Sequence, residues 1–188
     1  MDTVIAARME KELSGKVVGG WTLAECIGYG KSALVFRASR EATLGAIKIF
    51  DRELVERFGK PAQRERVLRE KLLVGKQHPN LIQILDAGED EALELFYVVM
   101  SLFPGKNLAE ALASVPHEKV HPLIAQVAAA ARFLEGLDLA HRDIKPENIG
   151  VTDDFSTAVL FDLGVMRPVG FSTITDQNGQ KIFVSTLQ

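Results

Sequence analysis

His-Arg-Asp-Ile-Lys-Pro-Glu-Asn, residues 141–148, is the most informative stretch of this sequence. It places a carboxylate (Asp143), an amine (Lys145) and an amide (Asn148) within one short loop. A long apolar segment typical of a helix precedes the loop, and short apolar segments typical of strands flank it. A His-Arg-Asp string alone could merely cap a helix, so the interpretation depends on the whole eight-residue string.

On either side of this loop the chain divides into a β-rich first half and a helical second half, which predicts an α+β fold in two lobes. Gly59 and Pro61 predict a break between two helices, the second with an apolar side made of Val67, Leu68, Leu72 and Leu73. The expected elements are a helix over 2–14, three strands within 21–50, two helices within 51–76, a hairpin around the acidic turn 89–92, and a helix over 122–137.

The composition is that of an ordinary globular protein. The chain has 188 residues, of which 47% are hydrophobic and 25% charged, and its net charge is −3. These values exclude wholesale disorder, and the slight acidity predicts no nucleic-acid partner. No apolar run is long enough to predict a membrane span. The single cysteine, Cys26, cannot form an internal disulfide, which favours a reducing, cytoplasmic location.

Residues 141–148 resemble the catalytic loop of eukaryotic-type (Hanks-type) serine/threonine protein kinases. The resemblance implies that Asp143 orients the attacking hydroxyl, Lys145 offsets phosphoryl charge, and Asn148 binds magnesium. Lys145 resembles the serine/threonine class more than the tyrosine class. Asp162-Leu-Gly resembles the Asp-Phe-Gly motif, which makes Asp162 the second magnesium ligand. The resemblance thus implies ATP and Mg²⁺ as cofactors, a protein substrate, and a two-lobed protein-kinase-like fold.

The resemblance continues upstream into a nucleotide site. Gly28-Tyr-Gly30-Lys-Ser-Ala33-Leu-Val35 resembles the phosphate-covering loop, and Gly45-Ala-Ile-Lys48 resembles the strand that carries the family's lysine. Without these neighbours, the glycines could simply form a hairpin turn and Lys48 could lie on an edge strand. A lysine in an apolar strand is costly unless paired. By resemblance, the residues expected at the nucleotide are Ile27, Gly28, Gly30, Val35, Ala46, Lys48, Glu70, Met100, Ser101 and Phe103.

Four further expectations concern the nucleotide site and the segment that follows Asp162. Glu70 is the expected partner of Lys48, with Glu65 as the alternative and a solvated helix acid as the plain interpretation. Gly150 stands where the family often has a bulky residue, which predicts a roomier adenine pocket. Arg142 could pair with a phosphate on the activation segment. The candidate phosphorylation sites are Ser172, Thr173 and Thr175.

The resemblance predicts a helical extension at 1–20, a small lobe at 21–101 and a partial large lobe at 102–188, because the sequence stops before the family's Ala-Pro-Glu motif. The helix over 122–137 is then expected to expose three or four apolar side chains, which favours a dimer or a covering partner. Its apolar set is Leu123, Ile124, Val127, Ala130, Phe133 and Leu134. Two alternatives stay open: an inactive nucleotide-binding or scaffold fragment, and a small-molecule phosphotransferase.

Overall fold

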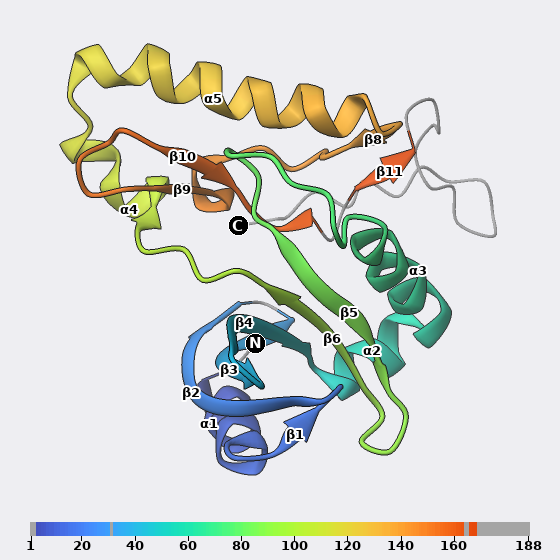
Figure 1. Cartoon of the computed structure of the whole chain (residues 1–188). Helices are drawn as coiled ribbons and strands as arrows, with labels where there is room; N and C mark the ends of the chain where they lie inside the picture. The colour runs from blue at the N-terminus through green and yellow to red at the C-terminus, as the bar shows by residue number, and fades with distance from the viewer. Residues whose placement is uncertain (1–2, 31, 164–165, 169–188) are drawn as a thin grey trace.

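A six-stranded antiparallel sheet is the largest element of the computed structural model, which describes residues 3–30, 32–163 and 166–168 (Figure 1). The strand order is β1-β2-β3-β4-β6-β5. The strands are β1 (Val17–Val18), β2 (Trp21–Tyr29), β3 (Ala33–Arg40), β4 (Thr43–Phe50), β5 (Ile84–Asp90) and β6 (Leu95–Met100). The three strands expected within 21–50 and the hairpin around 89–92 are thereby confirmed.

Helices pack on both faces of the sheet, α1 (Thr3–Leu13) on one face and α3 (Lys60–Lys71) on the β5–β6 part of the other. Helix α1 contacts β2 and β3, and its buried Ala6, Met9 and Leu13 join one apolar cluster with the sheet. Helix α3 contacts β5 and β6 and belongs to a second apolar cluster on the other face. The expected leading helix is confirmed, and it forms part of the core.

Helices α2 (Arg52–Phe58) and α3 meet at Gly59, as the sequence predicts. Gly59 has φ +98°, a conformation that favours glycine, and Pro61 opens α3. The predicted apolar side of this helix is partly wrong. Its buried residues are Gln63, Val67 and Glu70, which follow one another at spacings of four and three and so share a face. Leu68 and Leu72 are exposed.

The second half of the chain is built on α5 (His117–Glu135), which lies over β10 and contacts β8 (Figure 1). The helix begins earlier than predicted, because Pro116 takes the N-cap position and Pro122 is tolerated inside. The remaining elements are α4 (Leu108–Ala111), two short 3₁₀ helices, η1 (Leu112–Ser114) and η2 (Pro146–Asn148), and the strands β7 (Lys106–Asn107), β8 (Leu139–Ala140), β9 (Ile149–Val151), β10 (Ala158–Leu160) and β11 (Arg167–Pro168). They form a three-stranded sheet, β10-β9-β7, and a two-stranded one, β11-β8.

The apolar side chains of α5 are better covered than the sequence predicts. Leu123, Val127, Ala130 and Leu134 are buried. Of the six residues expected, only Ile124 is well exposed, at 62%, while the half-buried Phe133 lies against the ring of His78. The expectation of three or four exposed side chains is therefore wrong, because β8 and β10 cover this face. The face gives no support for a dimer or a covering partner.

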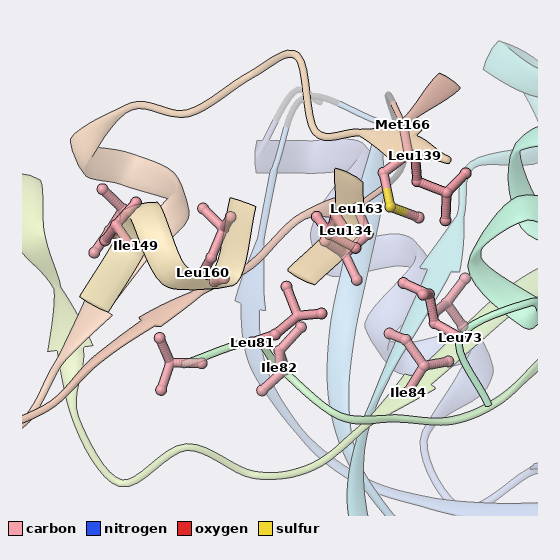
Figure 2. Packing of buried hydrophobic residues seen from close by; sticks show 14 of the residues in the cluster. Leu73, Leu81, Ile82, Ile84, Leu134, Leu139, Ile149, Leu160, Leu163 and Met166 are labelled. Atoms are coloured by element: carbon pink, nitrogen blue, oxygen red, sulfur yellow. The ribbon is translucent and has the colours of Figure 1, made fainter. Parts of the chain in front are cut away.

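Around α5, the core joins the two halves of the chain. Figure 2 shows Leu163 and Met166 close to Leu134 and Leu139, with Leu81 and Ile82 nearby. Ile82 N–H donates to the Leu160 carbonyl (3.0 Å), so the chain after α3 is bonded directly to β10.

Within the part of the chain that the structure describes, no helix combines the length and the hydrophobicity needed to cross a bilayer. The candidate phosphorylation sites Ser172, Thr173 and Thr175 lie outside the described residues.

Candidate active site

The register of the sheet brings three predicted nucleotide-site residues into one row. Lys48 on β4 pairs with Val35 on β3, and Val35 pairs with Gly28 on β2. Paired residues of antiparallel strands point to the same face. Ala46, two residues before Lys48, shares this face and pairs with Met100 on β6. Residues distant in sequence are thus aligned along one face of the sheet.

At the turn between β2 and β3, no other described part of the protein lies against the position that a side chain would take on Gly28 or Gly30. Gly30 N–H donates to the Ala33 carbonyl (2.9 Å), which closes the turn. A Cβ atom placed on Gly28 or Gly30 would meet nothing within 4 Å. Packing within the protein therefore does not require glycine at either position, and the space above both is open to a ligand. Ile27, beside them, is 44% exposed.

The segment after β6 offers backbone groups rather than charged side chains. Ser101 N–H donates to the Gln83 carbonyl (2.9 Å), so this N–H is not available to a ligand. Phe103 is half-buried, and its ring lies edge-on to Phe161 with the ring centres 5.4 Å apart. Met100, Ser101 and Phe103 thus follow one another along the connection that leaves the sheet.

The roomier pocket predicted at Gly150 is wrong. A Cβ atom on Gly150 would collide with the rings of Phe161 and Phe103. The space that a larger residue would occupy is therefore already filled. Phe161 was not singled out from the sequence, because an apolar residue next to Asp162 looks like any other strand residue.

The catalytic-loop residues form one hydrogen-bonded cluster. The Lys145 amine lies 2.9 Å from Asp143 Oδ2. Asn148 Nδ2 donates to the same Oδ2 (2.8 Å) and to the Asp143 backbone carbonyl (2.9 Å). Asn148 is buried, and Asp143 is 22% exposed at its side chain. The Asp143 carboxylate is thus held in one orientation while part of it stays accessible.

His141 connects this loop to the segment that carries Asp162. Its Nδ1 accepts from Asp143 N–H (3.3 Å), so the neutral ring carries its proton on Nε2 and donates to the Phe161 carbonyl (2.7 Å). Burial lowers the pKa of His141 and favours this neutral form. The sequence-based hypothesis gave His141 no role, although its place in the 141–148 string could have suggested one.

Asp162 leaves the end of β10 beside the start of β9. Ile149 pairs with Leu160, and Phe161 N–H donates to the Asn148 carbonyl (2.8 Å), so Asn148 and Asp162 emerge at the same end of a strand pair. Asp162 has φ +53°, which is uncommon for a residue with a side chain and typical of functional sites. Its Oδ1 lies 2.7 Å from the Lys48 amine.

Glu70 is, after Asp162, the second carboxyl group that acts on Lys48. It is 2% exposed, and among the residues that the structure describes its Oε1 has no hydrogen-bond partner. Burial raises the pKa of Glu70 to about 7, although the nearby Lys48 charge opposes the rise. Burial also disfavours the charge on Lys48, but the carboxylates of Asp162 and Glu70 outweigh it and raise the Lys48 pKa.

The expected Lys48–Glu70 ion pair is therefore not formed in this structure. Lys48 pairs with Asp162 instead, and no Glu70 oxygen lies within 4.0 Å of its amine. The alternative, Glu65, is 74% exposed and pairs with Arg69, so it is the solvated helix acid. Of the two candidates, only Glu70 lies close enough to influence Lys48.

The donor set at this end of the β9–β10 pair suits magnesium. Among the described residues, no donor bonds the amide oxygen of Asn148, and no cluster of three His, Cys, Asp or Glu side chains could hold a metal ion. Mg²⁺ is usually bound through one or two protein oxygens together with phosphates and water. One carboxylate and one amide oxygen fit that pattern and do not fit a structural metal cage.

Comparison with known proteins agrees with this arrangement. The family model "Protein kinase domain" matches residues 21–186. A probable serine/threonine-protein kinase of Clostridium perfringens, CPE1738, is 28% identical over 87% of this chain and 24% of its own length. Serine/threonine-protein kinase PrkC of Bacillus subtilis is 28% identical over 88% of this chain and 26% of its own. The chain thus spans about a quarter of the length of these relatives.

The kinase domain of Mycobacterium tuberculosis PknI has a similar structure, with a TM-score of 0.70 at 22% identity over 81% of this chain and 62% of that one. This likeness confirms the predicted α+β fold of the protein-kinase type. The chain belongs to the protein kinase domain family, and the relatives named above are serine/threonine kinases. The first twenty residues, which include α1, lie outside the matched region.

Proposed function

We propose that this chain transfers the terminal phosphoryl group of ATP, with Mg²⁺, to serine or threonine hydroxyls of protein substrates. The observation that carries the proposal is the bonded cluster of Asp143, Lys145 and Asn148 at the strand end from which Asp162 emerges. Phosphoryl transfer depends mainly on positioning and electrostatic stabilisation, and this cluster supplies the groups for both.

Asp143 is assigned to the substrate hydroxyl. Its carboxylate, fixed by Asn148 and partly exposed, orients the hydroxyl and accepts its proton. Lys145, 2.9 Å from the same carboxylate, is placed to offset the negative charge of the transferring group. The bond that forms joins the substrate oxygen to the phosphorus, and the Asp143 carboxylate acts on the oxygen while the Lys145 amine acts on the phosphoryl group.

Asp162 and Asn148 are assigned to the metal through the Asp162 carboxylate and the Asn148 amide oxygen. Bound Mg²⁺ would neutralise phosphate charge and orient the phosphates for displacement. Lys48 is assigned to the phosphates, so its amine would exchange part of its contact with Asp162 for phosphate oxygens. Glu70 is buried near Lys48, so its carboxyl group would still balance the Lys48 charge during that exchange.

The adenine is assigned to the face of the sheet that carries Val35 and Ala46. Met100 lies next to Ala46 in the register, and the Ser101 carbonyl and the Phe103 backbone follow at the exit from the sheet. Ile27, Gly28 and Gly30 complete the cover. Apolar walls with a few backbone hydrogen-bonding groups are typical of small-molecule sites.

The test measures binding and transfer on the same preparation. Calorimetry should detect ATP binding that strengthens with Mg²⁺, and labelled phosphate should pass to serine or threonine of a generic protein substrate such as casein. Binding without transfer to any acceptor would instead support an inactive nucleotide-binding fragment. Transfer to small hydroxyl compounds but not to proteins would support a small-molecule phosphotransferase.

A further inference from the structure

One side chain of α3 reaches the segment that follows Asp162. Arg69 Nη1 donates to the backbone carbonyl of Met166 at 3.0 Å. The same guanidinium is held from its own helix, because Nε donates to the Glu65 carbonyl (3.1 Å) and Nη2 to the Glu65 carboxylate (3.2 Å). The Arg69 side chain is 22% exposed. Nε and Nη2 of the Arg69 guanidinium therefore bond to α3, and Nη1 bonds to Met166.

Met166 lies four residues after Asp162 and is completely buried. Its N–H donates to the Leu163 carbonyl (3.1 Å), and both side chains pack near Leu134 and Leu139 (Figure 2). Apolar packing of Leu163 and Met166, together with the pairing of β11 with β8 directly after Met166, thus fixes these two residues against α5 and β8. In the part of the chain that the structure describes, the Arg69 hydrogen bond is the polar contact that fixes Met166 to α3.

The helix that carries Arg69 also carries Glu70, the next residue. Glu70 and Asp162 both act on the Lys48 charge, one from α3 and the other from the end of β10. Their relative placement depends on how the Asp162 segment sits against α3. A hydrogen bond between Arg69 and Met166 ties these two elements together within a few residues of both carboxylates.

We infer that Arg69 is a positioning residue, which holds Met166 against α3 and so keeps Asp162, four residues earlier in the sequence, where Lys48 and the metal need it. The inference rests on the proposed function. The plain alternative is that Arg69 only makes a surface ion pair with Glu65, four residues earlier on the helix. The two interpretations differ in what happens to Met166.

Two variants, Arg69→Met and its control Glu65→Gln, distinguish the two interpretations of Arg69. Arg69→Met keeps the apolar stem but removes every donor, so it breaks the bonds to both Met166 and Glu65. Glu65→Gln weakens the pair with Arg69 and leaves the bond to Met166. Losing a charge-assisted hydrogen bond of this kind changes an equilibrium by about tenfold. Arg69→Lys retains a charged donor and should recover part of the effect.

The first measurement is amide hydrogen exchange at Met166 without nucleotide, which does not depend on the proposed function. The second is calorimetric titration with a non-hydrolysable ATP analogue, with and without Mg²⁺. Arg69→Met should speed the exchange about tenfold and weaken Mg²⁺-dependent binding by a similar factor. Binding without Mg²⁺ should change less than about twofold, since no adenine contact is touched. Glu65→Gln should leave all three values near those of the unaltered chain.

Unchanged exchange in Arg69→Met would overturn the inference. So would equal losses of binding with and without Mg²⁺ alongside a lower melting temperature, which would indicate general destabilisation. If the unaltered chain bound no Mg²⁺-nucleotide at all, the proposed function would fail. In that case the exchange comparison would still decide whether Arg69 fixes the segment.

Discussion

Glu70→Gln should remove the part of this protein's pH-dependent stability that comes from one buried carboxyl group. In the folded protein, burial of the side chain, which is 2% exposed, raises the pKa of Glu70 from its ordinary 4.5 to about 7; the Lys48 charge opposes this rise and the Asp162 carboxylate adds to it. At about 1.4 kcal/mol per pH unit, that rise corresponds to about 3 kcal/mol. Glutamine has nearly the same shape but cannot ionise, so it isolates the cost of the charge.

The direction in which the free energy of unfolding changes with pH follows from proton binding. The folded state holds the Glu70 proton more tightly than the unfolded state does, so the free energy of unfolding falls as pH rises from about 4.5 to about 7 and then levels off. The glutamine variant lacks this loss. Its stability relative to the unaltered chain should therefore increase by up to about 3 kcal/mol between pH 5 and pH 8, measured by urea denaturation at each pH.

Glu65→Gln is the matched control on the same helix. Glu65 is 74% exposed, and its ion pair with Arg69 should be worth less than about 1 kcal/mol at either pH. The reasoning is refuted if the difference between Glu70→Gln and the unaltered chain changes by less than about 1 kcal/mol from pH 5 to pH 8. That result would mean that water or a small movement solvates the carboxylate.

Three other predictions test separate parts of the structure. Leu13→Ala, on the helix outside the family match, should cost about 2–5 kcal/mol in urea denaturation because the side chain is 2% exposed, whereas Val4→Ala, at 75% exposure, should cost less than about 0.5 kcal/mol. Equal effects would show that α1 does not belong to the core. Gly150→Val should destabilise by about 1–3 kcal/mol in the same assay, because its side chain must displace Phe161; a neutral result would restore the roomier pocket. Asp162→Asn should abolish the Mg²⁺-dependent part of nucleotide binding in calorimetry, and retention of that part would remove Asp162 from the metal site.

The clustering of Asp143, Lys145 and Asn148 and the positions of the strands were predictable because their information is local. Asp143, Lys145 and Asn148 are close in sequence, so a short loop leaves them few ways to avoid one another. The register that aligns Lys48 with Val35 follows from a tight hairpin between neighbouring strands. In both cases the chain length between the residues limits where they can lie.

The remaining contacts depend on how separate elements pack. Hydrophobic spacing placed Leu68 and Leu72 on the buried side of α3, but packing against β5 and β6 selected the face with Gln63 and Glu70. The partner of Lys48 also depends on where the end of β10 lies, which no local pattern specifies. Such choices are made by tertiary contacts, and one sequence contains no direct signal for them.

The same reason explains two errors in the second half of the chain. The apolar residues of α5 appeared too numerous to cover, because short strands such as β8 and β10 do not reveal from sequence which helix they pack on. The space at Gly150 appeared empty, because the ring that fills it comes from Phe161 on the far side of a strand pair. In both cases the sequence-based prediction treated a position as uncovered, although a segment distant in sequence packs against it.

The most direct test of the central claim is phosphate transfer by this chain and by its Asp143→Asn variant, at matched nucleotide binding. Labelled ATP, Mg²⁺ and a protein substrate are incubated with each, and phosphate on serine and threonine is counted while calorimetry measures nucleotide affinity. The proposed role of Asp143 predicts transfer by the unaltered chain, at least about a hundredfold less by the variant, and nearly equal affinities. Transfer by the variant within about tenfold of the unaltered chain, or no transfer by either despite tight binding, would contradict it.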